Sequence, residues 1–503
     1  MKRTINRPTH LVVIDVDGLR RDVFRNALAA GELPNVERIV GGQEAQKACP
    51  IDALSTAPSI TFAAQASIFT GQHPGAHGVA GNESFDRLGR ISGGRPRHFG
   101  FDVGYTLAVD DAVRVFTDGL ASQFLSREIP TLYETAAARG LSSAVAYHMY
   151  ARGADVWLPP NVVDIARFTK GKGALGLEAG RYDRGMLERL IGHLDTGGRP
   201  DVLTAYFMGL DHHSHVHGPA GQPAYLREVI DPQVGRLLDA LETRGLLPSS
   251  LFVLVSDHGQ IEVIPDDRHS IRLGFPFDRE LGHVFQALGL DVHDIPGEDP
   301  ACDAVAGLNG GLAHVYLQHR AGRWADFPRY EVDVLPVAEA FRQMNETGKY
   351  EDELQGSLEL ILVRDAGREG WRGAYRVYLG EGRTQPLADY LAAHPELGYA
   401  DAAHRIWLAA GAMTGDLILV ANGRAGYYFG APTTGVHGGL YPEESEVVLT
   451  FAYPGGSPDG IAWLREMVSG VVADACANEG GREPSVADMV PAALAVLGPG
   501  PDL

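Results

Sequence analysis

The chain has 503 residues, of which 45% are hydrophobic and 21% charged, so it can bury a large core and is not composed like a disordered protein. Its formal net charge of -21 argues against a general binder of nucleic-acid polymers or anionic membranes, because both need a basic face. Three scattered cysteines, no signal-peptide core and no long apolar run predict a cytoplasmic protein without a disulfide framework or membrane span.

Short apolar runs predict buried strands at residues 11–16, 202–207, 251–255, 417–420 and 447–451. Amphipathic segments lie between them, and residues 225–244 have Leu, Val and Ile at helical spacing. This alternation predicts an α/β fold in which a mostly parallel sheet carries helices on both faces. Residues 262–412 differ in composition and contain short strand pairs. We therefore expect an inserted α+β cap there, and a core formed by residues 1–261 and 413–503.

The first run ends at Asp17 and Gly18. Glycine lets the chain turn sharply, and ligands gather beyond the carboxyl ends of parallel strands, so Asp17 is expected to face a site. An Asp-Gly pair is also an ordinary turn.

Further along, Thr61 stands just before an Ala-rich helical stretch at residues 62–69. A hydroxyl there lies where backbone N–H groups attract anions, although the same position is also typical of a simple N-cap.

The later runs are followed by further metal-ligand residue types. Asp211 and His215 are one helical turn apart, which allows them to share a metal ion. Asp257 and His258 end the third run, and His437 lies in a glycine-flanked loop. Together with Asp17, these residues offer three ligands to each of two ions, with coordination positions left open for a substrate. Mixed nitrogen and oxygen ligands suit zinc, with manganese or iron as alternatives.

In their order along the chain, these motifs resemble those of the alkaline phosphatase superfamily, and most closely its nucleotide pyrophosphatase/phosphodiesterase branch. The matching segments are Asp17-Gly18, Pro58-Ser59-Ile60-Thr61-Phe62, Asp211 to His215, Ser256-Asp257-His258-Gly259 and His437-Gly438. The resemblance implies an alkaline-phosphatase-like core and two metal sites. Their ligands would be Asp17, Asp257 and His258, completed by Thr61, and Asp211, His215 and His437. It also implies that Thr61 is the nucleophile and that Asn82 binds a phosphoryl oxygen.

The expected reaction is hydrolysis of a phosphodiester, a pyrophosphate or a related phosphonate through a phosphothreonine intermediate. Charge favours a diester, because three carboxylates and a Thr61 alkoxide balance two divalent ions, and no Lys or Arg follows Thr61 before Arg87. The cap could still supply a cation such as Arg268 or Arg272. A phosphomonoesterase, a phosphotransferase or mutase, and a binding-only relative stay open as alternatives. We expect a small anionic phosphoester as the partner, without nucleic-acid polymer or membrane; the oligomeric state stays open.

Overall fold

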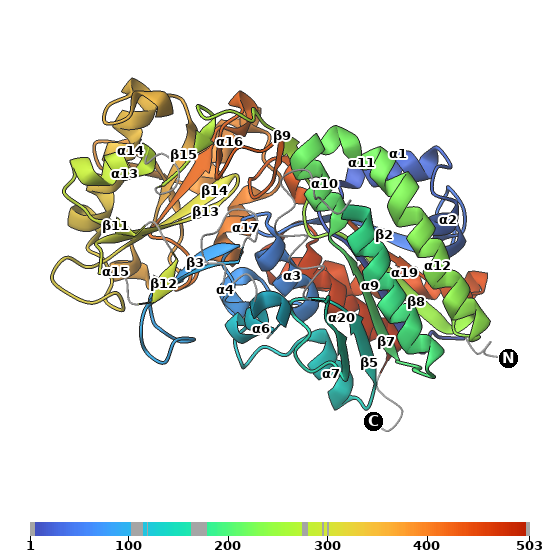
Figure 1. The fold of residues 1–503 in the computed structure, drawn as a ribbon. Coiled ribbons are helices and arrows are strands. Elements are labelled where there is room, and N and C mark those ends of the chain that lie inside the picture. The colour runs from blue at the N-terminus through green and yellow to red at the C-terminus, as the bar shows by residue number, and fades with distance from the viewer. Residues whose placement is uncertain are drawn as a thin grey trace.

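The structure is a computed structural model that describes residues 6–101, 114–117, 119–161, 179–273, 280–293, 296–298 and 301–498. Two sheets of seven strands dominate it, one in each half of the molecule (Figure 1). The first sheet has the order β2-β21-β8-β1-β7-β5-β6. Its strands are β1 (His10–Val16), β2 (Ala48–Leu54), β5 (Ser143–Ala146), β6 (Val156–Leu158), β7 (Val202–Phe207), β8 (Ser250–Val255) and β21 (Glu446–Ala452).

The first sheet is mostly parallel, as the sequence predicts. Strands β8, β1, β7, β5 and β6 run parallel, whereas β21 pairs antiparallel with both β8 and β2. Every residue of β7 and β8 is buried, which is typical of strands covered on both faces. Their continuous apolar sequence is explained by this burial, because a strand with one solvated face would alternate with polar residues.

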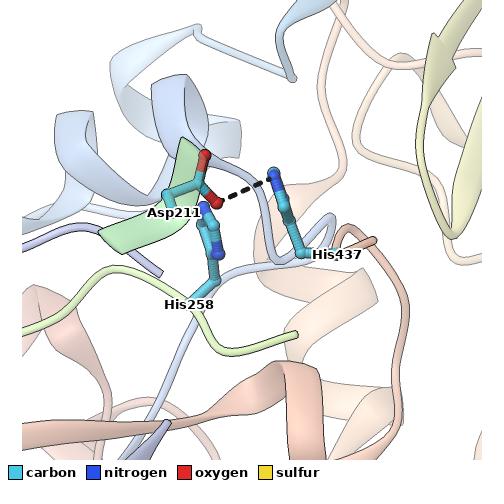
Figure 2. A group of neighbouring side chains, drawn as sticks. All are labelled: Asp211, His258 and His437. Atoms are coloured by element: carbon cyan, nitrogen blue, oxygen red, sulfur yellow. Dashed lines mark ion pairs between the residues drawn. The ribbon is translucent and has the colours of Figure 1, made fainter. Parts of the chain in front are cut away.

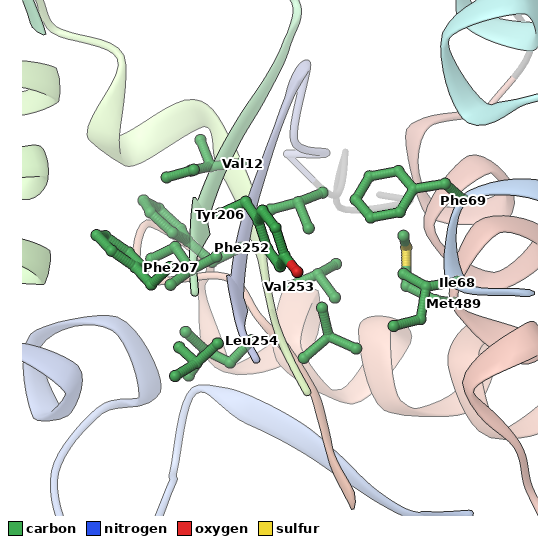
Figure 3. Close-up of a cluster of buried hydrophobic side chains, with 14 of the residues drawn as sticks. Val12, Ile68, Phe69, Tyr206, Phe207, Phe252, Val253, Leu254 and Met489 are labelled. Carbon is green, nitrogen blue, oxygen red and sulfur yellow. The ribbon is translucent and has the colours of Figure 1, made fainter. Parts of the chain in front are cut away.

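Helices cover both faces of this sheet. Helix α9 (Ala179–Asp195) packs on β5 and β7, and α20 (Met489–Leu497) packs on β1 and β8. Figure 3 shows Met489 with Ile68 and Phe69 of α3 (Thr61–Thr70) beside the apolar side chains of the central strands. The predicted helix at residues 225–244 is present as α12 (Asp231–Thr243), preceded by a π-helical turn. Within the described part of the chain, none of the helices combines the length and hydrophobicity that a bilayer crossing requires.

The second sheet lies mainly within the predicted cap and has the order β11-β13-β14-β18-β15-β16-β17. Its strands are β11 (Val292–His293), β13 (Ala304–Asn309), β14 (Leu312–Leu317), β15 (Leu358–Val363), β16 (Arg376–Gly380), β17 (Arg383–Pro386) and β18 (Leu417–Ala421). The predicted pairing of two strands near residues 360 and 377 is present as β15 and β16.

One strand prediction is wrong. The run at residues 417–420 was expected in the first sheet, but β18 pairs antiparallel with β14 and β15 of the second. Its five residues are all buried, so its composition matches that of a core strand in either sheet. The division into core and cap stays a prediction. The pairing of β18 with β14 and β15 favours a boundary after β18, so that the chain would re-enter the core there rather than at residue 413.

Candidate metal centre

Three predicted carboxylates meet at the carboxyl edge of the first sheet. Asp17 follows β1, Asp257 follows β8, and Asp211 lies in the first turn of α10 (Gly209–His217), which follows β7. Because β1 pairs in parallel with both β7 and β8, the three segments leave the sheet side by side. Gly18 permits this approach, since its φ is +73° and a Cβ there would lie 2.9 Å from the Cβ of Asp211. Its N–H donates to Asp257 Oδ1 at 3.0 Å.

In each of the three predicted histidines, Nδ1 lies near a backbone carbonyl oxygen and Nε2 is directed toward the site. Each Nδ1 lies near a backbone carbonyl oxygen: His215 near Gly435 at 2.8 Å, His258 near Gly259 at 3.0 Å and His437 near Ser59 at 3.3 Å. A carbonyl oxygen can only accept, so each Nδ1 carries the ring proton when the imidazole is neutral. Each Nε2 then presents a lone pair to the site, which is the arrangement that metal-binding histidines adopt.

The potential ligand atoms form two groups that share His258. In the first group, Asp17 Oδ1 and Asp257 Oδ2 each lie 3.4 Å from His258 Nε2. In the second, His437 Nε2 lies 3.6 Å from Asp211 Oδ1, and its ring stacks on His258 with centroids 3.7 Å apart (Figure 2). Within each group of three residues, the ligand atoms all lie within 4.8 Å of one another.

His215 adjoins the second group. Its Nε2 lies 3.3 Å from Asp211 Oδ2 and 3.2 Å from His437 Nε2. If both imidazoles are neutral, two lone pairs face each other at this distance, and only a cation or a proton makes the contact favourable. The structure therefore brings all six predicted Asp and His residues together, with His258 between the two groups rather than confined to one.

Buried carboxylate oxygens give an independent test of whether this site fits cations. Among the described residues, Asp17 Oδ1 and Asp257 Oδ2 are buried without a hydrogen-bond partner. Burial raises the pKa of Asp17 well above its ordinary value, and the neighbouring Asp257 and Asp211 raise it further. Burial likewise raises the pKa of Asp257. Burial and then His258 push the pKa of His437 well below its usual range. Buried carboxylate oxygens without hydrogen-bond partners, placed beside imidazole nitrogens, are a donor set that fits divalent ions.

The predicted nucleophile borders the first group. Thr61 Oγ1 lies 3.1 Å from His258 Nε2. Thr61 is the first residue of α3, and Ile60 occupies the N-cap, so the simple capping role considered from the sequence is wrong. Asn82 lies close by, because its amide oxygen accepts a hydrogen bond from the N–H of Phe62 at 3.0 Å. The NH2 group of Asn82 is then the part that can donate to a phosphoryl oxygen.

A family model described as type I phosphodiesterase / nucleotide pyrophosphatase matches residues 11–367. The chain belongs to this family. The resemblance seen in the sequence motifs is thereby confirmed, and the protein is a phosphodiesterase-like enzyme. Its Asp and His clusters are groups that can bind the divalent metals on which the family typically depends.

Solved structures show the same fold at low sequence identity. Murine ectonucleotide pyrophosphatase/phosphodiesterase 5 superposes with a TM-score of 0.50 and 14% identity over 88% of each chain. An inactive threonine-to-alanine form of that protein, in complex with AMP, gives the same TM-score and identity over 89% of this chain and 88% of its own. The catalytic subunit of mouse GPI ethanolamine phosphate transferase 3 is 40% identical over 79 residues, which are 15% of this chain and 7% of the transferase.

Two residues that support the ligands of this phosphodiesterase-like site were missed in the sequence. The Tyr206 hydroxyl donates to Asp17 Oδ2, and Gln260 Nε2 donates to Asp211 Oδ1. Both side chains are buried. A tyrosine inside the apolar run of β7 and a glutamine directly after the Asp-His-Gly motif were usable signals, because buried polar groups require partners.

Of the arginines named in the sequence as nearby or possible clamping cations, Arg87 and Arg272 have carboxylate partners, whereas Arg268 is exposed. Arg87 is fully buried and contacts both carboxylate oxygens of Asp416 at 3.0 and 3.1 Å. Arg272 pairs with Asp267 and Glu280 at 3.2 and 3.1 Å. Both guanidinium groups are therefore held by carboxylates, and the expectation of a substrate of low charge stays a prediction.

Asp183 fixes the start of α10 and gives a pH prediction. Its carboxylate accepts from Gly209 N at 3.0 Å and from the Tyr225 hydroxyl at 2.7 Å, and burial raises its pKa to about 7. Because this value exceeds the unfolded value of about 3.9, the wild type should lose stability as the pH rises from about 4 through 7. Asp183→Asn should avoid that loss, so its Tm relative to wild type should rise over this interval and then level off. A pH-independent Tm difference would contradict the assignment.

Proposed function

We propose that the protein is a hydrolase of phosphodiester or pyrophosphate bonds that uses two divalent metal ions and Thr61 as its nucleophile. The observation that carries this proposal is the placement of Thr61 Oγ1, at 3.1 Å from His258 Nε2 and at the start of α3. A hydroxyl in this position borders the buried carboxylates and lies where the first N–H groups of a helix favour an anion.

The divalent ions would lower the pKa of the attacking hydroxyl and neutralise charge on the phosphoryl group. Asp17, Asp257 and His258 would hold one ion, and Asp211, His215 and His437 the other. Thr61 Oγ1 attacks phosphorus in line and forms a phosphothreonine that keeps the second ester group of the substrate, while the alcohol or phosphate on the opposite side leaves. Asn82 donates its NH2 group to a phosphoryl oxygen. Water then cleaves the phosphothreonine and regenerates the threonine hydroxyl.

Charge supports a diester, a pyrophosphate or a phosphonate monoester over a phosphomonoester. Three carboxylates and a threonine alkoxide carry as much negative charge as two divalent ions carry positive charge. A dianionic monoester would need an additional cation, and Arg87 and Arg272 are held by Asp416, Asp267 and Glu280. The complex of the inactive murine relative with AMP supports a nucleotide as one candidate product.

Zinc is the metal that we propose for both sites. Each site offers imidazole nitrogen together with carboxylate oxygen, a mixed set that zinc prefers and that manganese and iron also accept. The two groups share the space around His258, whose Nε2 lies 3.4 Å from Asp17 Oδ1 and whose ring stacks on His437. Metal analysis of the purified protein would identify the ion that the chain selects.

A phosphotransferase is the second candidate, because the partial match to the ethanolamine phosphate transferase concerns an enzyme of that type. The two candidates share the phosphothreonine and differ only in what accepts the phosphoryl group. Turnover of an ethanolamine phosphodiester with and without an added alcohol such as glycerol separates them. A transferase would pass ethanolamine phosphate to the added alcohol in preference to water, whereas a hydrolase would release the same phosphate ester with or without it.

A substrate panel tests the proposed function. We expect a higher kcat/KM for bis-p-nitrophenyl phosphate and p-nitrophenyl phenylphosphonate than for p-nitrophenyl phosphate, because carboxylates hold Arg87 and Arg272 and so keep them from balancing a second negative charge. Acid quenching during turnover should leave a phosphoryl group on Thr61 that peptide mass spectrometry detects. Faster turnover of the monoester would overturn the diester assignment, and a labelled residue other than Thr61 would overturn the nucleophile.

A further inference from the structure

Arg405 reaches from the predicted cap into the segment that precedes Thr61. It lies on α17 (Ala402–Ala409) and is 6% exposed. Its Nε donates to Ser55 O at 3.0 Å, and its Nη2 donates to Thr56 O at 2.6 Å and to Ser59 Oγ at 2.5 Å. Its Nη1 donates to Ala400 O at 3.0 Å, two residues before its own helix begins. One buried guanidinium therefore joins α17 to three residues of the segment 55–59.

The segment that Arg405 holds is connected to both halves of the candidate site. Residue 59 is two positions before Thr61, and Ile60 O accepts the N–H of Ala64 in the first turn of α3. The carbonyl of Ser59 lies 3.3 Å from His437 Nδ1, so it orients the imidazole. The Ser59 hydroxyl also lies 3.1 Å from Gly439 O, which is on the loop that carries His437. A shift of residues 55–59 would therefore move the nucleophile and His437 together.

Arginine is required at this position by geometry. Three acceptors on separate residues accept hydrogen bonds from one planar guanidinium group, whose N–H directions are fixed. Lysine offers a single nitrogen on a flexible stem and cannot reach the same three acceptors at once. Arg405 also lies outside residues 11–367, the part of the chain that matches the family model, so its role is not implied by that match.

We infer that Arg405 is a positioning residue, which fixes the segment 55–59 so that Thr61 and His437 keep their places at the metal centre. The inference rests on the proposed function, since it assumes that Thr61 and His437 act there. It makes part of the predicted cap a component of the catalytic machinery.

The test is Arg405→Lys, assayed for diester hydrolysis and for hydrogen exchange of residues 54–62 in the metal-free protein. Displacing a nucleophile by a fraction of an ångström to about 1 Å costs up to about 100-fold in rate, so we expect kcat to fall by roughly 10- to 100-fold with little change in KM. Amide exchange in residues 54–62 should become faster. Ser59→Ala should shift both readouts in the same direction by a smaller factor, and it is the fallback if the lysine variant fails to fold.

Two matched controls separate positioning from loss of stability. Val337→Ala shortens a buried side chain of α14 (Leu335–Thr347), whose hydrophobic cluster includes no residue of the segment 55–59. Arg372→Lys changes an exposed arginine that also bridges to the core, through Gly75 O at 3.2 Å. Assayed well below their Tm, both should keep kcat near the wild-type value.

If Val337→Ala lost as much kcat as Arg405→Lys, or if exchange in residues 54–62 were unchanged in Arg405→Lys, the inference would be overturned. The exchange readout does not depend on turnover. It therefore tests the positioning of the segment 55–59 even if the wild-type chain proved inactive on diesters, the result that would overturn the proposed function instead.

Discussion

Replacing Thr61 with alanine should lower kcat by about four orders of magnitude or more, with the fold and metal content preserved. The substitution removes Oγ1 while leaving all six Asp and His side chains in place. Helix α3 should stay intact, because the nine residues after Thr61 are all buried and the N-cap is Ile60. Steady-state turnover, metal content per chain by mass spectrometry and thermal melting would each be measured on the same preparation.

Two variants of α3 make this result interpretable. Thr61→Ser keeps a hydroxyl at the same position and should retain measurable turnover and a trappable phosphoenzyme. Thr70→Ala removes a hydroxyl from the other end of the helix, where it donates to Ala66 O at 2.6 Å, and should leave turnover close to wild type. If Thr61→Ala kept a substantial fraction of wild-type turnover, attack by Thr61 would be wrong, and direct attack by water would have to replace it.

The core of the fold could be predicted from the sequence because parallel strands buried on both faces have a distinctive composition. The runs that became β1, β7 and β8 are mostly apolar, and polar residues directly follow the first and the last of them, Asp17 after β1 and Ser256 after β8. The run that became β18 has the same composition, yet it pairs with β14 and β15. Burial determines the composition of a strand. Which strands it pairs with depends on contacts between residues far apart in the sequence, and a local sequence pattern does not encode those contacts.

The candidate site could be predicted to a similar extent, and for a related reason. Asp17, Asp211 and Asp257 follow strands that lie next to one another, so their convergence follows from the parallel register. The supporting residues were not predictable in this way. Gln260 donates to Asp211, which is 49 positions away, and Arg405 contacts Ser59 across 346 positions. Neither belongs to a motif, because their roles depend on tertiary packing.

Removing the metal ions should abolish turnover and lower the Tm, and adding zinc should restore both. The reason is the buried, unpaired oxygens of Asp17 and Asp257, which have no hydrogen-bond partner among the described residues. An ion that binds only the folded state at about 1,000 times its Kd adds about 4 kcal/mol of stability. Because the pKa of both carboxyls is raised in the folded protein, zinc binding should also release protons, which a weakly buffered titration would detect.

Asp257→Asn should change stability in opposite directions with and without metal. The amide oxygen can still accept from Gly18 N and His258 N, as Asp257 Oδ1 does at 3.0 and 2.9 Å. Since the folded pKa of Asp257 lies above its unfolded value, the metal-free wild type loses stability as the pH rises from about 4 through the folded pKa. Without metal at neutral pH, the variant should therefore melt at a higher temperature than wild type. With zinc it should melt lower and bind fewer ions, because it lacks a charged ligand. A variant less stable under both conditions would show that Asp257 is a structural carboxylate rather than a metal ligand.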